Sequence, residues 1–212
     1  MDLYETIYAR RTVRDFREKE VDTEVIQKMI DAGLQAPTNN HLREWEFIVV
    51  KERAAKIELL RRINQDTTAA HAKSIVDSWG LVDGNQREMY LDAIPKQYRM
   101  LLNAGCIVIP CFRQTAPLLQ PQTLFALNGF ASIWCCIENI LLAAVNEGIY
   151  GVTRIPSAAE VAHLKAVTQI PADYEIPCYL ALGYPDEQAK PVAQHIVRAA
   201  ERIHFNQWSA QS

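Results

Sequence analysis

Several sequence signatures of catalysis and nucleotide binding are missing from this chain of 212 residues. No CxxC pair occurs among its five cysteines, so neither a zinc site nor an iron–sulfur cluster is expected. The absence of GxGxxG and GxxxxGK(S/T) disfavours a Rossmann nucleotide site and a P-loop. The five histidines form no HxxxH or HExxH spacing, and no serine lies in a GxSxG turn. The sequence therefore predicts no metal ligands, and it offers no catalytic acid or nucleophile.

A large excess of charge is missing as well. The formal net charge is -3 and the isoelectric point is near 6.0. Nucleic-acid binding needs a surface that neutralises phosphates, so no nucleic-acid partner is expected. Positively charged side chains are instead expected to act at a local site, such as one that binds a single anionic ligand.

No secretory leader is expected, because acidic residues stand where the basic start of a signal peptide would be. One apolar run, residues 124–144, resembles a membrane span. An ionised Glu138 at mid-bilayer would cost about 2.5–3.5 kcal/mol, so we expect a helix buried in the protein or in a dimer, and no membrane partner. The cysteines are odd in number and lie among apolar residues. This pattern favours buried thiols in a reducing compartment, and hence the cytoplasm.

Hydrophobic periodicity predicts helices and strands in irregular order. Strands are expected at residues 45–50, 106–112, 150–154 and 177–182. Helices are expected after Asp2 and at residues 23–34, 53–63, 123–146 and 157–167. The helix at 123–146 is apolar all round and should therefore be central, and Ser157 with Glu160 should form a capping box.

The wide spacing of the clear strands predicts one three-layer α+β domain over residues 1–212 rather than regular βαβ units. Residues 65–103 are the least readable, with helical fragments near 74–79 and 86–93. They are interpreted as a lid or an inserted subdomain. Residues 186–212 are interpreted as a C-terminal extension.

A basic cluster is the strongest local signal. Arg10, Arg11 and Arg14 place three fixed positive charges within five residues, and Thr12 adds a hydroxyl. Arginine forks donate to phosphate oxygens in pairs, so the cluster fits a cradle for one phosphate. The alternative is a solvated basic turn paired with nearby acidic residues.

The cluster is also the first of four blocks that resemble the nitroreductase family. "ARRTVRDF" resembles the family's opening basic run, and "AGLQAPTNNHLREWEFIVV" resembles its second signature. "ENILLAAVNEGIYG" resembles the central helix with its closing glycine turn, and "PCYLALGYP" resembles the final core strand. The blocks occur in family order and reach from the first residues to Pro185, with only the middle of that region unmatched.

The resemblance implies a three-layer α/β/α nitroreductase-like fold with a mixed, mostly antiparallel sheet and a long central helix at the dimer interface. It implies a homodimer that binds FMN at the subunit boundary and takes electrons from NAD(P)H. The flavin-binding positions that it implies are Arg10, Arg11, Thr12 and Arg14 for the phosphate and ribityl chain; Pro37, Thr38 and Asn39 from the partner; Thr153, Arg154 and Ile155 along the ring; and His195 or Arg198 for a further phosphate contact.

The sequence departs from the family pattern at His41, Arg43 and Glu44, which leaves the substrate class open. The leading hypothesis is a ping-pong reductase of nitroaromatics, quinones or similar planar, electron-poor molecules. A second hypothesis keeps the fold and changes the reaction to reductive dehalogenation or flavin modification. A third is a non-catalytic dimer that binds flavin as a sensor or store.

Overall fold

A five-stranded sheet forms the centre of the protein in a computed structural model that describes residues 1–114, 116–190 and 192–208. Its main path runs β1-β2-β5-β3, and β4 pairs with β2. Every pairing between these strands is antiparallel, and one parallel bridge joins Thr12 to Gly151. The strands are β1 (Trp45–Val50), β2 (Cys106–Arg113), β3 (Tyr150–Arg154), β4 (Tyr174–Glu175) and β5 (Tyr179–Gly183).

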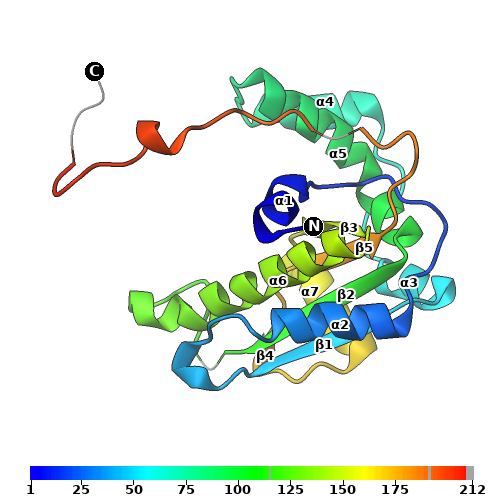
Figure 1. The fold of residues 1–212 in the computed structure, drawn as a ribbon. Coiled ribbons are helices and arrows are strands. Elements are labelled where there is room, and N and C mark those ends of the chain that lie inside the picture. The colour runs from blue at the N-terminus through cyan, green and yellow to red at the C-terminus, as the bar shows by residue number, and fades with distance from the viewer. Residues whose placement is uncertain (115, 191, 209–212) are drawn as a thin grey trace.

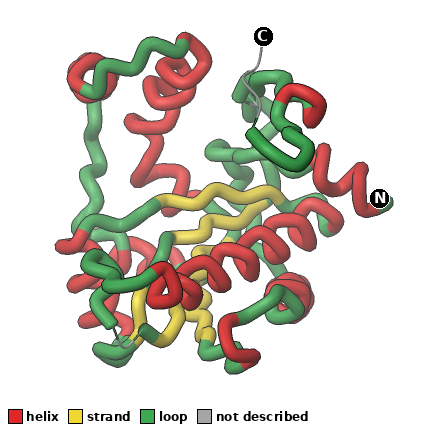
Figure 2. Tube along the Cα trace, turned by 90° about the vertical axis from the view of Figure 1, so that its left-hand side faces the viewer, coloured by secondary structure: helices red, strands yellow, loops and turns green. Residues whose placement is uncertain are grey.

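Helices cover both faces of this sheet (Figures 1 and 2). The helices are α1 (Leu3–Ala9), α2 (Thr23–Gly33), α3 (Arg53–Leu59), α4 (Ala69–Ser78), α5 (Gly84–Asn103), α6 (Asn128–Asn146) and α7 (Ala158–Thr168). Three short 3₁₀ turns occupy Asn39–His41, Leu124–Leu127 and Ala199–Glu201. The predicted three-layer α+β architecture is confirmed.

The alternation of side chains along β2 creates the two cores. Ile107 and Ile109 face one core with α3, α5 and α7, whereas Cys106 and Val108 face the other with α2 and α6. Successive strand residues point to opposite faces, so a strand between two helical layers must be apolar at nearly every position. This arrangement explains the unbroken apolar run that predicted a strand buried on both faces.

Helix α6 is less enclosed than the sequence suggested. One side packs on β2 and α2, with Ile133 and Ile140 fully buried, but the side chains of Leu124 and Phe125 just before it are 86% and 63% exposed. The stretch Leu124–Asn146 is long and apolar enough to cross a membrane by length and composition, a test that core helices of globular proteins also pass.

Residues 65–103 contain a helical hairpin in which α4 lies away from the sheet, whereas the end of α5 returns to the main core (Figures 1 and 2). Thr68 and Asp83 cap the two helices by accepting the backbone N–H of His71 and Gln86. Both helices are longer than the predicted fragments, and α5 continues through Pro95. A proline inside a helix costs about 3 kcal/mol, and the burial of Met100 and Leu101 in the main core acts against that cost.

The predicted capping box at Ser157 is only half formed. The Ser157 hydroxyl accepts the backbone N–H of Glu160, but the Glu160 carboxylate binds Arg154 instead of returning to the cap. A complete box occurs at α1, where Asp2 and Glu5 cap each other's backbone. Competition from a buried guanidinium therefore decides the direction of the Glu160 side chain.

Candidate functional site

The basic cluster lies in an extended segment that runs along β3. Arg10 ends α1 by donating its backbone N–H to Thr6, and Thr12 then pairs with Gly151. Val13 is buried in the core and donates its backbone N–H to Gly151 at 3.2 Å. Residues alternate in an extended chain, so anchoring Val13 inward turns Thr12 and Arg14 to the other side.

Arg10 and Thr12 share a cavity of about 200 Å³ with Thr153 of β3. The opposite wall belongs to α6, which contributes Trp134 and Glu138. Three of the predicted cofactor-binding residues, from two distant parts of the sequence, therefore line one cavity.

Arg10 carries a competing anion beside it. Its Nε lies 3.2 Å from Glu138 Oε1, and the two side chains are 32% and 51% exposed. A phosphate held by Arg10 must share or displace this carboxylate. Glu138 was noted in the sequence as an interruption of an apolar helix, and the structure shows that it belongs to the candidate site.

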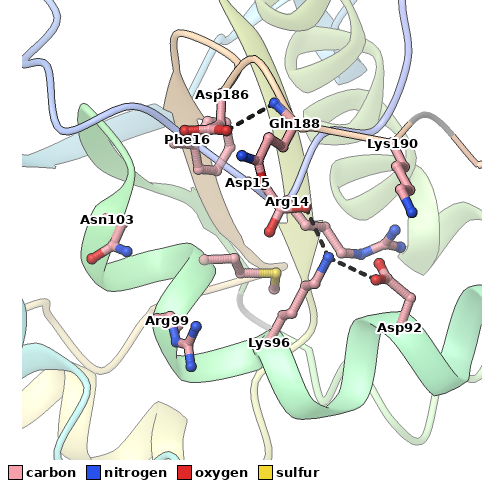
Figure 3. A pocket seen from close by; sticks show the side chains of 11 residues that line it. Arg14, Asp15, Phe16, Asp92, Lys96, Arg99, Asn103, Asp186, Gln188 and Lys190 are labelled. Carbon is pink, nitrogen blue, oxygen red and sulfur yellow. Dashed lines mark hydrogen bonds and ion pairs between the residues drawn. The ribbon is translucent and has the colours of Figure 1, made fainter.

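Arg14 borders a second cavity, of about 410 Å³, between the basic segment, α5 and residues 186–190 (Figure 3). Its Nη2 lies 3.3 Å from the Met89 sulfur, and partial burial lowers its pKa against the opposing effect of Asp92 and Asp15. Lys96 joins those two carboxylates, at 2.8 Å from Asp15 and 2.6 Å from Asp92. The apolar floor is Phe16 and Met100, both buried.

Two of the predicted residues have side chains committed elsewhere. Arg11 donates from Nη1 to the Arg10 carbonyl at 2.7 Å. Arg154 forms a buried two-pronged ion pair with Glu160 and donates to Gln97 Oε1 at 3.0 Å. The Arg154 side chain is therefore committed within the chain, whereas the neighbouring Ile155 is 62% exposed.

The Arg154 pair ties three elements together. Arg154 ends β3, Glu160 lies on α7 and Gln97 lies on α5. The guanidinium also lies over the Tyr179 ring at 5.5 Å, and burial raises the pKa of Tyr179. Sequence reasoning missed Glu160 and Gln97 because nothing in their spacing indicates a partner in another element.

The loop after α2 lies against a different part of α6. Asn39 donates its backbone N–H to the Ser132 hydroxyl at 3.0 Å, and Thr38 accepts the backbone N–H of Arg43. Ser132 is six residues from Glu138, which is about 9 Å along a helix and on another face. Pro37, Thr38 and Asn39 do not line the cavity at Arg10.

The residues that depart from the family pattern make contacts within this chain. Arg43 donates to the Leu34 carbonyl at 3.0 Å, and Glu44 pairs with Arg113 at 3.0 Å. His41 and Arg43 have positive φ values of 57° and 46°, an uncommon conformation for residues other than glycine. The two charges are thus not a pair directed at a substrate within this chain.

His195 and Arg198 lie on the C-terminal segment, away from the Arg10 cavity. His195 Nε2 lies 3.0 Å from the carboxylate of Asp83, which also caps α5. His195 and Asp83 line a third cavity together with Met89, whose sulfur contacts Arg14. Arg198 is exposed before a 3₁₀ turn, and residues 199–208 project from the body (Figure 1).

The donor set at Arg10 fits a phosphate-bearing flavin. Arg10 and Thr12 are partly exposed donors beside a cavity, and the Thr12 and Thr153 side chains make no hydrogen bond within the described residues. Guanidinium and hydroxyl groups at a cavity rim are the donors that phosphate and ribityl oxygens require. A cavity of this size holds part of FMN, so the remainder of the ligand would need the open α6 side or a second subunit.

The titratable groups offer no competing centre. Within the described residues, no group of three His, Cys, Asp or Glu side chains is placed to hold a metal. All five thiols are free; four are buried as predicted, and Cys135 is exposed. Burial raises the pKa of Cys106, Cys111 and Cys136 to about 12, which keeps these thiols protonated and unreactive.

The chain is similar to proteins whose names refer to nitroreductases and deiodinases. A relative from Methanothermobacter thermautotrophicus, whose name refers to NADH dehydrogenase and NAD(P)H nitroreductase, is 28% identical over 98% of this chain and 88% of its own. Human iodotyrosine deiodinase 1 is 28% identical over 89% of this chain, which spans 63% of the human protein.

Solved structures show the same fold. Iodotyrosine deiodinase bound to FMN and 3-iodo-L-tyrosine has a TM-score of 0.72 at 19% identity, covering 98% of this chain and 100% of that one. The NADPH:FMN oxidoreductase of Vibrio harveyi has a TM-score of 0.65 at 22% identity, covering 99% and 79%. The nitroreductase family model matches residues 7–184, and the chain therefore belongs to the nitroreductase family.

Proposed function

We propose that the protein is an FMN-dependent oxidoreductase that takes electrons from NAD(P)H and passes them to nitroaromatics, quinones or similar electron-poor planar molecules. The observation that carries the proposal is the meeting of Arg10, Thr12 and Thr153 at one cavity against α6. Names of the relatives and fold neighbours that refer to FMN, NADPH and NAD(P)H support the cofactor and the donor.

When bound, FMN would supply the redox chemistry between the nicotinamide and the electron-poor acceptor. The chain's own contribution is positioning. Arg10 and Thr12 hold the phosphate end, and Thr153 with the Arg154 backbone supports the ring. The buried Arg154–Glu160 pair keeps that backbone rigid. The nicotinamide and the electron acceptor would bind in turn at the same side of the flavin site. A ping-pong cycle is therefore part of the proposal.

The test is spectroscopic. Purified protein titrated with FMN should gain a bound-flavin absorbance spectrum, and anaerobic NADH or NADPH should bleach it. Steady-state rates with a nitroaromatic or quinone should then give parallel double-reciprocal lines. A colourless protein that does not alter the FMN spectrum would overturn the proposal.

A homodimer is the proposed assembly, because large apolar side chains near α6 and on α1 are exposed in the single chain. Leu124 and Phe125 before α6 are exposed, as are Leu3 and Tyr4 of α1. A second copy would cover them and complete the flavin site with Pro37, Thr38 and Asn39. The five free thiols accord with the proposed cytoplasmic location.

The dimer is tested by sedimentation. The unmodified protein should sediment as a dimer, and Phe125→Ser combined with Leu124→Ser should shift it toward monomer and weaken FMN binding. The matched control is Val82→Ser, which replaces a side chain that is 97% exposed outside this surface. A monomeric parent protein that binds FMN tightly would contradict the shared site.

Reductive dehalogenation is the second candidate function. Several relatives are named iodotyrosine deiodinases, including those of human and Hydra vulgaris, each 28% identical to this chain. Turnover of a halophenol compared with a nitroaromatic and a quinone separates the two enzymatic proposals. Flavin that binds but is not bleached by either nicotinamide would instead favour the non-catalytic sensor or store.

A further inference from the structure

A separate basic cavity lies at the junction of β2 with the α3 and α5 ends, and it shares no residue with the cavity at Arg10. Its volume is about 190 Å³. Four cationic and two acidic side chains line it, namely Lys19, Lys51, Arg53, Lys56, Glu18 and Glu20. The excess of positive charge contrasts with the acidic protein as a whole.

Lys56 is the unusual member of this group. Only 5% of the residue is exposed, and its Nζ donates to the Ala104 carbonyl at 2.5 Å. No carboxylate forms an ion pair with it within the described residues. Burial lowers the pKa of Lys56. A buried ammonium without a counter-ion is costly, because one neutral acceptor replaces only part of its hydration.

The nearby charges compensate that cost only in part. Glu20 acts to raise the pKa of Lys56, but its carboxylate lies 3.4 Å from Lys51 Nζ and is shared with that ammonium. Lys19 places its ammonium 4.0 Å from the centre of the Tyr184 ring. Arg53 is exposed and has no ion pair among the described side chains. The guanidinium of Arg53 and the free N–H groups of Lys56 remain as donors for a ligand.

We propose that this cavity binds a phosphate group, as inorganic phosphate or the phosphate of a small monoester, between Arg53 and Lys56. An oxyanion supplies several acceptors to a buried ammonium and to the fork of an arginine, which neutral ligands do not. The volume suits a small oxyanion with a few waters and is too small for a flavin or dinucleotide.

Thermal unfolding of the FMN-saturated protein tests the site. Inorganic phosphate at about ten times its Kd should raise Tm by about 3–6 °C above sodium chloride of equal ionic strength. Saturation with FMN keeps the probe from the Arg10 cavity. Glycerol phosphate in a parallel titration separates the two ligand sources: a shift from either supports the site, and a shift from neither overturns it.

Variants locate the effect. Arg53→Gln and Lys56→Met should abolish the phosphate-dependent shift, and isothermal titration should show the corresponding loss of binding. Arg62→Gln, an exposed arginine outside the cavity, is the matched control and should keep the full shift. The Lys56→Met protein should also fold without phosphate, because a buried charge has been replaced by an apolar side chain of similar length.

Failure of this site is distinguishable from failure of the proposed flavin site. A phosphate shift that persists in Arg10→Gln but disappears in Arg53→Gln belongs to the basic cavity, whether or not FMN binds. A shift lost in Arg10→Gln and retained in Arg53→Gln would overturn the inference and assign the anion to the candidate flavin site.

Discussion

Replacing Glu138 with glutamine should tighten FMN binding. The carboxylate lies 3.2 Å from Arg10 Nε and occupies the donor that we assign to the phosphate. Glutamine keeps the length and shape of the side chain while it removes the negative charge. The variant therefore ends the competition for Arg10 and also removes repulsion of the incoming phosphate.

The solvent exposure of the two side chains limits the size of this effect on FMN affinity. Both side chains are about a third exposed or more, so the ion pair contributes at most about 1 kcal/mol after solvent screening. Releasing that energy lowers the Kd for FMN by up to about fivefold. The gain in FMN affinity should shrink when the salt concentration is raised from about 0.05 M to about 0.5 M, because salt already weakens the Arg10–Glu138 ion pair in the parent protein.

Quenching of FMN fluorescence on titration with protein measures the Kd directly. Glu147→Gln is the matched control, because Glu147 ends the same helix and pairs with Lys28 away from the cavity. Its Kd should equal that of the parent protein. A Glu138→Gln protein that binds FMN no better, or more weakly, would refute the assignment of Arg10 as the phosphate anchor.

Three further substitutions test the site and its support. Arg10→Gln should weaken FMN binding by about tenfold or more, the value of one hydrogen bond to a charged group, whereas Arg11→Gln should have a smaller effect in the same titration. Glu160→Ala should lower the free energy of unfolding in urea by about 3–5 kcal/mol, because it leaves the buried Arg154 unpaired; a loss below 1 kcal/mol would contradict a buried pair. Gly33→Ala should cost about 1–3 kcal/mol despite alanine's better helix propensity, since the new Cβ would lie 2.6 Å from a side-chain atom of α6; unchanged urea stability would show that the α2–α6 contact yields readily.

Much of the fold follows from local pattern. The alternating run at residues 45–50 and the apolar runs within β2 and β5 predicted the central strands closely, because period and β-branching act within a few residues. Helix α2 begins at Thr23 as expected, and β3 occupies the predicted residues. The α4–α5 hairpin was underestimated: only helical fragments near 74–79 and 86–93 were predicted, whereas α5 continues through Pro95 to Asn103.

The candidate site was predictable in composition but not in pairing. The arginine cluster is visible as a local excess of charge, and the family resemblance linked it to Thr153. Glu138 as a neighbour of Arg10, and Glu160 as the partner of Arg154, depend on which helix faces which strand. That information is spread over the whole chain and leaves no local mark.

The sequence by itself determined the strands, the main helices and the position of the cationic segment, because these follow from short-range periodicity and charge. Only the tertiary structure decided that the Arg154 side chain is internal, that His195 binds Asp83 and that Lys56 is buried without a counter-ion. The physical reason is that burial and electrostatic pairing are properties of neighbours in space, and each of these neighbours comes from a distant part of the chain or from another element.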